Sequence, residues 1–179
     1  MDPRVITTAR LRLVPHEPEH LRALIQGPEF YARASGMTPA PGLRGFIVSP
    51  DVSAEWLSAL KTAAGADPWK YGFAVVEIAG GRVIGSAGFA GPPDADSVVE
   101  IAYGIVPDYE GHGYATEVAE ALVGYAQKEG RARTVCAHTL PARNASTRVL
   151  EKCAFRFAGE VNHPTDGLIW RWERELASA

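Results

Sequence analysis

The sequence predicts a mixed α/β fold of the α+β type, with a mostly antiparallel central sheet of about seven strands flanked by about four helices. Two observations support this fold class. The chain has 179 residues, of which 46% are hydrophobic and 22% are charged, which is typical of one globular domain. Segments with two-residue alternation and segments with helical spacing also follow one another along the whole chain. We find no repeat and no linker, so we expect residues 1–179 to form a single domain.

The N-terminal part is predicted to hold one strand, two helices and a long loop. Residues 8–14 alternate apolar and basic side chains, which indicates a half-exposed strand that Pro15 ends. Residues 17–26 carry leucines at helical spacing after early acidic residues, and residues 51–64 form a second amphipathic pattern. Between them, residues 27–50 are rich in Gly, Pro and small side chains, so we expect a loop that serves as a lid over an acceptor site.

The rest of the chain is predicted to combine six strands with two longer helices. Residues 71–78 and 82–89 are β-rich and flank Gly80-Gly81, which predicts an antiparallel hairpin. Residues 97–106 are nearly continuous in Val, Ile, Ala and Tyr, as in a central strand. The remaining predicted elements are helices at residues 114–128 and 144–152 and strands at residues 134–139, 155–161 and 168–175.

The charge and the cysteine content exclude several classes of protein. Lys and Arg total 18 against 21 Asp and Glu, so no overall positive charge favours nucleic acid as a partner. The N-terminus lacks the pattern of a secretory signal, and no run of about 18 apolar residues could span a membrane, so we expect a cytoplasmic protein with no membrane partner. Cys136 and Cys153 are too few for a disulfide framework, and we expect reduced, buried thiols rather than nucleophiles.

A glycine turn between a predicted strand and a predicted helix carries the strongest chemical signal. Its residues are Glu110, Gly111, His112, Gly113, Tyr114, Ala115 and Thr116. Glycines let successive backbone N–H groups converge, and the positive end of the helix dipole strengthens their attraction for a phosphate. Taken by themselves, two glycines before a helix are a weak signal and more often form a plain tight turn. The turn therefore predicts either a diphosphate site or a structural connection.

Three segments resemble one known family. Residues 110–117 (EGHGYATE) resemble the GxGxATE form of the CoA pyrophosphate motif of GNAT-superfamily acetyltransferases. Residues 144–155 (NASTRVLEKCAF) are similar to the N-x-S and VLEK-x-GF helix-to-strand segment of that superfamily. Residues 8–13 (TARLRL) are similar to the first strand of the RimJ/RimL-like branch, the ribosomal-protein N-terminal acetyltransferases. The three segments follow the family's order over most of the chain, which implies a GNAT fold and acetyl-CoA as cosubstrate, without a metal.

The resemblance also implies roles for particular residues. The backbone amides of Gly111, His112, Gly113, Tyr114, Ala115 and Thr116 would hold the CoA pyrophosphate. Ile105 and Val106 would lie beside the pantetheine arm, which would bond to them as an extra strand. Asn144 and Ser146 stand where this branch places polar side chains at the cofactor or thioester, and Ser146 would protonate the departing thiolate. Helix N-capping is the alternative role for both, and the two roles are compatible.

Three positions depart from the family pattern. Glu110 replaces the usual Gln or Arg, so we expect no side-chain contact between this acid and the phosphates. Arg143 stands where an asparagine is expected, with Asn144 one place later. Ala154 replaces the glycine before Phe155, so that a positive φ at this position is either not needed or strained.

Two residues of the central strand are candidates for catalysis. Glu100 is the one charge in this apolar segment, and partial desolvation would suit it as a general base, directly or through water; the alternative is an acid at the exposed start of a strand. Tyr103 is a core aromatic, an acid or a wall of an acceptor tunnel. A backbone N–H near Ile105 would stabilise the oxyanion.

These residues predict an N-acetyltransferase in which a primary amine attacks acetyl-CoA directly in a ternary complex. The branch resemblance suggests a protein N-terminal α-amine as acceptor, and a small-molecule amine remains an alternative. A non-catalytic acyl-CoA-binding or regulatory domain with the same fold is a second hypothesis, because a pyrophosphate motif by itself does not require turnover. A homodimer is compatible with the family.

Overall fold

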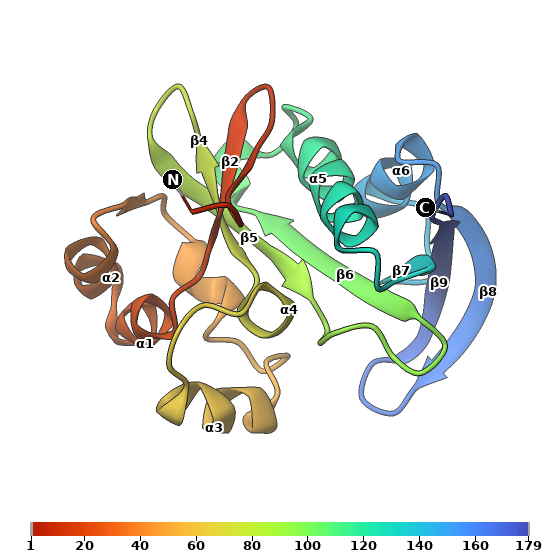
Figure 1. The fold of residues 1–179 in the computed structure, drawn as a ribbon, viewed down its shortest axis with the longest axis horizontal. Coiled ribbons are helices and arrows are strands. Elements are labelled where there is room, and N and C mark those ends of the chain that lie inside the picture. The colour runs from red at the N-terminus through yellow and green to blue at the C-terminus, as the bar shows by residue number, and fades with distance from the viewer. Residues whose placement is uncertain (1, 179) are drawn as a thin grey trace.

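The computed structural model describes residues 2–178, which form one nine-stranded sheet with helices on both sides (Figure 1). The strands are β1 (Ile6–Thr7), β2 (Leu11–Pro15), β3 (Thr38–Pro39), β4 (Phe73–Glu77), β5 (Arg82–Phe89), β6 (Val98–Ile105), β7 (Thr134–Thr139), β8 (Arg156–His163) and β9 (Gly167–Glu175). Their order across the sheet is β1-β2-β4-β5-β6-β7-β9-β8, and β3 pairs with β5. Only the β3–β5 and β6–β7 pairs are parallel. The predicted fold class and the central place of residues 97–106 are confirmed.

Six α-helices occur in the described part of the chain. They are α1 (Pro18–Gln26), α2 (Pro28–Ser35), α3 (Ala54–Thr62), α4 (Pro68–Tyr71), α5 (Tyr114–Glu129) and α6 (Ala145–Lys152). The long helix α5 and the shorter α6 lie on one side of the sheet, and α1, α2 and α3 lie on the other (Figure 1). Val118 and Leu122 of α5 are fully buried in the core. None of the helices between residues 2 and 178 is long and apolar enough to cross a membrane.

The prediction of a loop at residues 27–50 is wrong, and the structure has more strands and helices than the sequence predicts. The segment contains α2, β3 and a 3-10 helix, η1 (Leu43–Phe46). Helix α2 begins with Pro28 at its first position and ends at Gly36, whose φ of 70° is left-handed. Proline suits the first position of a helix, and glycine suits the position after its last residue. The Pro and Gly content of this segment, which is typical of a loop, therefore comes in part from the two ends of a helix. The other unexpected elements are the four-residue α4 and the two-residue β1 and β3, too short to show a period.

Strands β6 and β7 diverge part-way along their length. They pair in parallel from Val98 to Glu100 only, while β6 continues to Ile105 against β5. The backbone of Glu100 accepts a hydrogen bond from Ala90, and Val106 N donates to Ile84 O at 2.8 Å, so the even-numbered residues of β6 bond toward β5. In an antiparallel ladder the backbone N–H and C=O groups of the alternate residues, here the odd-numbered ones, point to the opposite side of the strand. The N–H groups of Tyr103 and Ile105 therefore face the opening between β6 and β7.

Ala154 ends α6 in a left-handed conformation. Its φ is 59°, and the amides of Ala154 and Phe155 donate to the carbonyls of Glu151 and Leu150. These two bonds form a Schellman motif, in which glycine is the usual residue at the left-handed position. Of the two alternatives at this position, the strained one is therefore correct: the positive φ is needed and an alanine adopts it.

Replacing Ala154 with glycine should stabilise the protein. The left-handed conformation costs a residue with a Cβ atom about 1 kcal/mol or more, and glycine avoids this cost. We expect Ala154→Gly to raise the free energy of unfolding by about 1 kcal/mol in chemical denaturation. The matched control is Ala59→Gly in the exposed part of α3, where right-handed helical backbone makes glycine destabilising. A loss of stability in both variants would contradict the proposed strain.

Candidate active site

The glycine turn lies at the start of α5, next to the opening between β6 and β7. Gly111 and Gly113 have φ values of 76° and 81°, a conformation that residues with side chains rarely adopt. In the described part of the chain, the N–H groups from Gly111 to Thr116 donate to no protein acceptor. The first hydrogen bond of the helix runs from Glu117 N to Gly113 O, at 3.2 Å. Consecutive free N–H groups at a helix N-terminus make an anion site.

A cavity of about 560 Å³ lies between this turn, the end of β6 and the N-terminal half of α6. The predicted site residues that line it are Tyr103, Ile105, Gly111, Gly113, Tyr114, Ala115, Thr116 and Ser146. Val106 and His112 do not: the Val106 N–H is bonded to β5, and the His112 ring lies in solvent with Nδ1 3.2 Å from Tyr109 O. The turn, the strand end and the helix are thus brought together as one site.

The start of α6 separates the two roles considered for Asn144 and Ser146. Asn144 Oδ1 accepts a hydrogen bond from Thr147 N at 3.0 Å, and Thr147 Oγ1 accepts one from Asn144 N at 3.0 Å. This capping box confirms the N-cap role of Asn144, which does not line the cavity. Ser146 lies on the cavity wall, and its hydroxyl has no partner among residues 2–178. A cofactor contact by Ser146 therefore stays a prediction that the geometry favours.

Two basic residues of α6 complete the cavity and were not found by the sequence analysis. Arg148 and Lys152 lie four positions apart, on one face of the helix, and both line the cavity. They provide positive charge near the turn, where Glu110 is also exposed on the cavity rim. The signal was present as a pair of basic residues at helical spacing, but the sequence does not show which face of α6 meets the turn.

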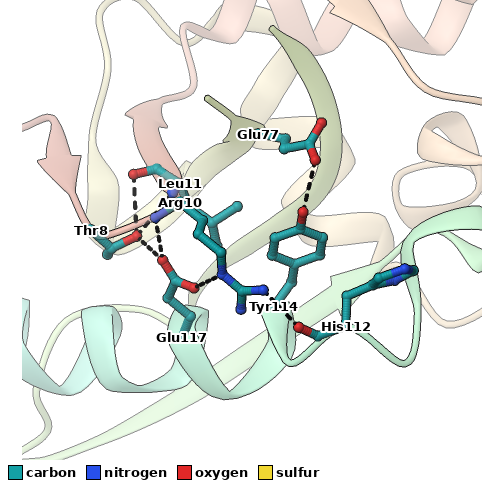
Figure 2. A network of polar contacts seen from close by, with 7 residues as sticks. All are labelled: Thr8, Arg10, Leu11, Glu77, His112, Tyr114 and Glu117. Carbon is teal, nitrogen blue, oxygen red and sulfur yellow. Dashed lines mark hydrogen bonds and ion pairs between the residues drawn. The ribbon is translucent and has the colours of Figure 1, made fainter. Parts of the chain in front are cut away.

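A polar network attaches the glycine turn to the turn between β1 and β2 (Figure 2). Glu117 accepts hydrogen bonds from the Thr8 hydroxyl and from both the backbone N and Nε of Arg10, each of the latter at 2.8 Å. Arg10 also donates to the carbonyl of His112 at 2.8 Å and stacks over the Tyr114 ring at 4.5 Å. Thr8 and Arg10, which the alternation at residues 8–14 predicts to be in a strand, lie before β2 instead, and no local pattern indicates their contact with the glycine turn. Arg10 holds the turn in place from the far end of the chain.

The same network sets the ionisation of Glu117. Partial burial acts to raise its pKa, but the hydrogen bonds from Thr8 and Arg10 outweigh burial and hold the pKa below the ordinary 4.5. Beside it, Tyr114 donates its hydroxyl to Glu77 at 2.7 Å (Figure 2). This hydrogen bond raises the pKa of Tyr114. The network is therefore most stable with Glu117 ionised and Tyr114 protonated.

Glu100 forms a hydrogen bond with His138, a residue that no pattern in the sequence singles out. His138 Nδ1 lies 2.7 Å from Glu100 Oε1, and the two side chains are 20% and 37% exposed. Since Glu100 pairs with Cys136 in the register of β6 and β7, the period of two places His138 on the same face of the sheet. An ionised carboxylate only accepts hydrogen bonds, so Nδ1 carries the proton in this pair. Glu100 is therefore half-buried and oriented, rather than enclosed by apolar side chains.

Tyr103 lies at the boundary between two cavities. The second cavity, of about 460 Å³, shares Phe46, Tyr103 and Gly104 with the first. It extends from this boundary between η1, α3 and the open face of β5 and β6. Burial raises the pKa of Tyr103 far above its ordinary value of 10.0, so its phenol stays protonated. Of the three roles considered for Tyr103, the geometry favours a wall of the acceptor path.

Both cysteines are free and buried, as the sequence predicted. Burial raises the pKa of Cys136 to about 11 and that of Cys153 to about 12. Thiols with such values carry almost no thiolate at neutral pH, so they are poor nucleophiles. Residues 2–178 also contain no group of three or more His, Cys, Asp or Glu side chains placed to hold a metal ion.

A comparison with protein families identifies the family to which this fold belongs. The sequence matches the model of the acetyltransferase (GNAT) domain over residues 10–156, which is most of the chain. The chain belongs to the GNAT acetyltransferase family. It is thus an acetyl-CoA-dependent N-acyltransferase, and the family predicted from the glycine turn and the α6 segment is confirmed.

Solved structures share the whole fold at low sequence identity. A GNAT-family acetyltransferase from Bacillus anthracis is 22% identical, with a TM-score of 0.64 over 96% of this chain and 98% of that one. An acetyltransferase from Salmonella typhimurium that modifies the N-terminal serine of ribosomal protein L7/L12 is 13% identical, with a TM-score of 0.64 over 97% and 100%. RimL in complex with coenzyme A is 15% identical, with a TM-score of 0.66 over 98% and 100%. No curated protein matches the sequence.

The residues of the first cavity fit the diphosphate and pantetheine of CoA. The free N–H groups from Gly111 to Thr116 suit phosphate oxygens, and Arg148 and Lys152 supply compensating charge. The Ile105 N–H faces the opening in which an amide-bearing arm can add to the edge of β6. The second cavity opens next to this site and shares Phe46, Tyr103 and Gly104 with it.

Removing the two cations of α6 should weaken CoA binding. We expect Arg148→Gln/Lys152→Gln to raise the Kd for CoA about tenfold at low salt and to make it less salt-dependent, because fewer charge pairs form. Titration calorimetry at two salt concentrations measures both effects. Lys61→Gln/Lys128→Gln changes the net charge equally at exposed sites outside the cavity and is the control. Equal weakening in both double variants would show a net-charge effect only.

The Glu117 network should make stability depend on pH. A carboxyl whose folded pKa is lowered contributes stability above its unfolded pKa and loses that contribution as pH falls through the folded value. We therefore expect Glu117→Gln to destabilise the protein at pH 7, by an amount that shrinks as pH falls below about 4.5. Urea unfolding of both proteins across this range measures the difference. If the difference in unfolding free energy between wild type and Glu117→Gln does not change with pH, the negative charge of Glu117 does not stabilise the fold.

Proposed function

We propose that this acetyltransferase moves the acetyl group of acetyl-CoA to a primary amine by direct attack in a ternary complex. One observation carries the proposal: the CoA-compatible cavity and the second cavity meet at Phe46, Tyr103 and Gly104. Two reactants that enter from opposite sides can then meet without a covalent enzyme intermediate. The buried, protonated thiols of Cys136 and Cys153 agree with direct attack.

The chain's own groups account for binding and for carbonyl activation. When bound, acetyl-CoA supplies the acetyl group as a thioester and leaves as the thiol. The turn amides, Arg148 and Lys152 hold the phosphates, and the Ile105 N–H faces the opening as a donor for the carbonyl oxygen on which negative charge develops. Donors fixed in a strand need little reorganisation during the reaction.

Glu100 is the proposed general base. His138 occupies Oε1 and fixes the carboxylate, which leaves Oε2 to receive a proton. Glu100 lines neither cavity, but Ala102, two residues along the same face of β6, lines the second one. That separation is about 7 Å along a strand, so a water molecule between Glu100 and the amine fits better than direct transfer.

Ser146 is the proposed donor of the proton that the departing thiolate needs. Its free hydroxyl lies on the cavity wall at the second position of α6, where the helix dipole favours negative charge on a neighbouring group. Tyr103, as a protonated phenol on the same cavity, is the second candidate for this donor. The proposed acceptor is a protein N-terminal α-amine or a small-molecule amine.

Glu100→Gln and Ser146→Ala should lower kcat more than they change the KM for acetyl-CoA. Loss of a general acid or base removes about 10²- to 10⁴-fold in rate, while the phosphate site is untouched. Thiol release from acetyl-CoA with a panel of primary amines measures both constants.

Glu129→Gln, an exposed acid at the far end of α5, is the control and should keep full activity. Full activity in Glu100→Gln and Ser146→Ala would refute these two roles but not the family. Tight binding of acetyl-CoA by the wild type without turnover of any amine would favour a non-catalytic acyl-CoA-binding domain.

A further inference from the structure

The second cavity is lined mainly by aromatic and small side chains. Phe46, Trp56 and Tyr71 form its walls, and Trp56 and Tyr71 contact each other edge-to-face. Its floor is the face of β5 and β6 that carries Ser86, Gly88, Ala102 and Gly104. Ser86 is the only residue of this floor with a polar side chain. A single hydroxyl on an apolar floor has an orienting effect on whatever binds above it.

A buried histidine on the same face of the sheet contacts Ser86. His16 follows β2, is 2% exposed, and its Nε2 lies 3.2 Å from Ser86 Oγ. Desolvation by burial, with a smaller effect of His20, lowers the pKa of His16 to about 3, so the ring is uncharged at neutral pH. His16 Nδ1 has no hydrogen-bond partner in the described part of the chain.

The lack of a partner at His16 Nδ1 decides which atom donates in the hydrogen bond between His16 and Ser86. A buried N–H without a partner is rarer and costlier than a buried lone pair without one, so the proton of the neutral ring belongs on Nε2. Nε2–H then donates to Ser86 Oγ. The Ser86 hydroxyl proton is consequently directed away from His16, and Ser86 acts as a donor toward the cavity.

This donor lies beside the point where the two cavities meet. Ser86 pairs with Gly104 in the register of β5 and β6, and Gly104 lines both cavities. Directly opposed residues of an antiparallel pair have Cα atoms about 5 Å apart. If the amine attacks beside Gly104, the atom two bonds from its nitrogen therefore lies close to the Ser86 hydroxyl.

We propose that Ser86, oriented by His16, donates a hydrogen bond to a carbonyl oxygen adjacent to the reacting amine, so that the acceptor is an α-amino carbonyl compound rather than a simple alkylamine. Peptide N-termini, amino-acid amides and amino acids share this chemistry. This inference rests on the proposed acetyl transfer and narrows its acceptor class. Ser86 is a specificity residue, and His16 is a positioning residue that acts through it.

The test compares two acceptors of similar size, glycinamide and propylamine, in wild type and Ser86→Ala. The ratio of variant to wild-type kcat/KM is taken for each acceptor, which cancels the intrinsic difference in amine reactivity. We expect Ser86→Ala to reduce kcat/KM about tenfold for glycinamide and less than twofold for propylamine, in keeping with the loss of one hydrogen bond. Ser58→Ala, exposed on α3 outside the cavity, should leave both ratios at one.

Variants of His16 test the positioning role. His16→Gln keeps an N–H donor for Ser86 and should retain the preference for glycinamide, whereas His16→Leu should lose it as Ser86→Ala does. If His16→Leu does not fold, Ser86→Cys, which keeps the size but donates weakly, replaces it. Glycine and a glycyl peptide, added to the panel, separate amino acids from peptides.

Equal loss of kcat/KM for glycinamide and propylamine in Ser86→Ala would overturn the inference while leaving acetyl transfer intact. The same conclusion would follow if wild type showed no preference for the carbonyl-bearing acceptors after correction for amine reactivity. Failure of wild type to acetylate any amine would overturn the proposed function as well.

Discussion

The divergence of β6 and β7 after Glu100 is the constraint on which the rest of the site depends. Parallel pairing ends there, so the N–H groups of Tyr103 and Ile105 remain unpaired by β7 and face an opening. Unsatisfied backbone groups beside a core are costly, and a ligand that adds as a strand offsets this cost. Glu100, the proposed base, is the last residue of β6 that pairs with β7. Its partner His138 lies farther along β7, where that strand diverges from β6. The same geometry thus provides both the opening proposed for the cofactor and the orientation of Glu100.

The glycine turn can bind an anion well only if its backbone is held rigid, and Arg10, about 100 positions away in the sequence, provides this restraint. Gly111 and Gly113 supply the left-handed backbone, but glycine also allows many other conformations, and this freedom would lower the affinity for an anion. Arg10 limits it by bonding to the His112 carbonyl and to Glu117 of α5 at once. The turn between β1 and β2 therefore preorganises the glycine turn of the proposed CoA site, without lining the cavity itself.

Local signals made much of this structure predictable from the sequence. The bounds of β5 and β7 agree with the prediction, because alternation and turn residues act over a few neighbouring positions. The glycine turn at the start of α5 was found for the same reason. Helix α2 was missed because its Pro and Gly caps resemble loop composition. The pairs Glu100–His138, His16–Ser86 and Arg10–Glu117 join residues 38, 70 and 107 positions apart, and no local pattern shows which strands bring them together.

The His16–Ser86 pair is difficult to explain by stability alone. A buried imidazole with an unpartnered nitrogen costs free energy, and replacing two hydrogen-bonded partners with apolar groups of the same shape is often neutral or stabilising. An apolar pair on the floor of β5 would therefore fold at least as well. What it would lose is the fixed direction of one hydroxyl proton beside Gly104, where the cavities meet. The His16–Ser86 pair thus has a cost for folding and lies where a reactant must be oriented. Recognition explains such a pair better than packing does. Loss of selectivity without loss of stability is the signature that separates the two explanations.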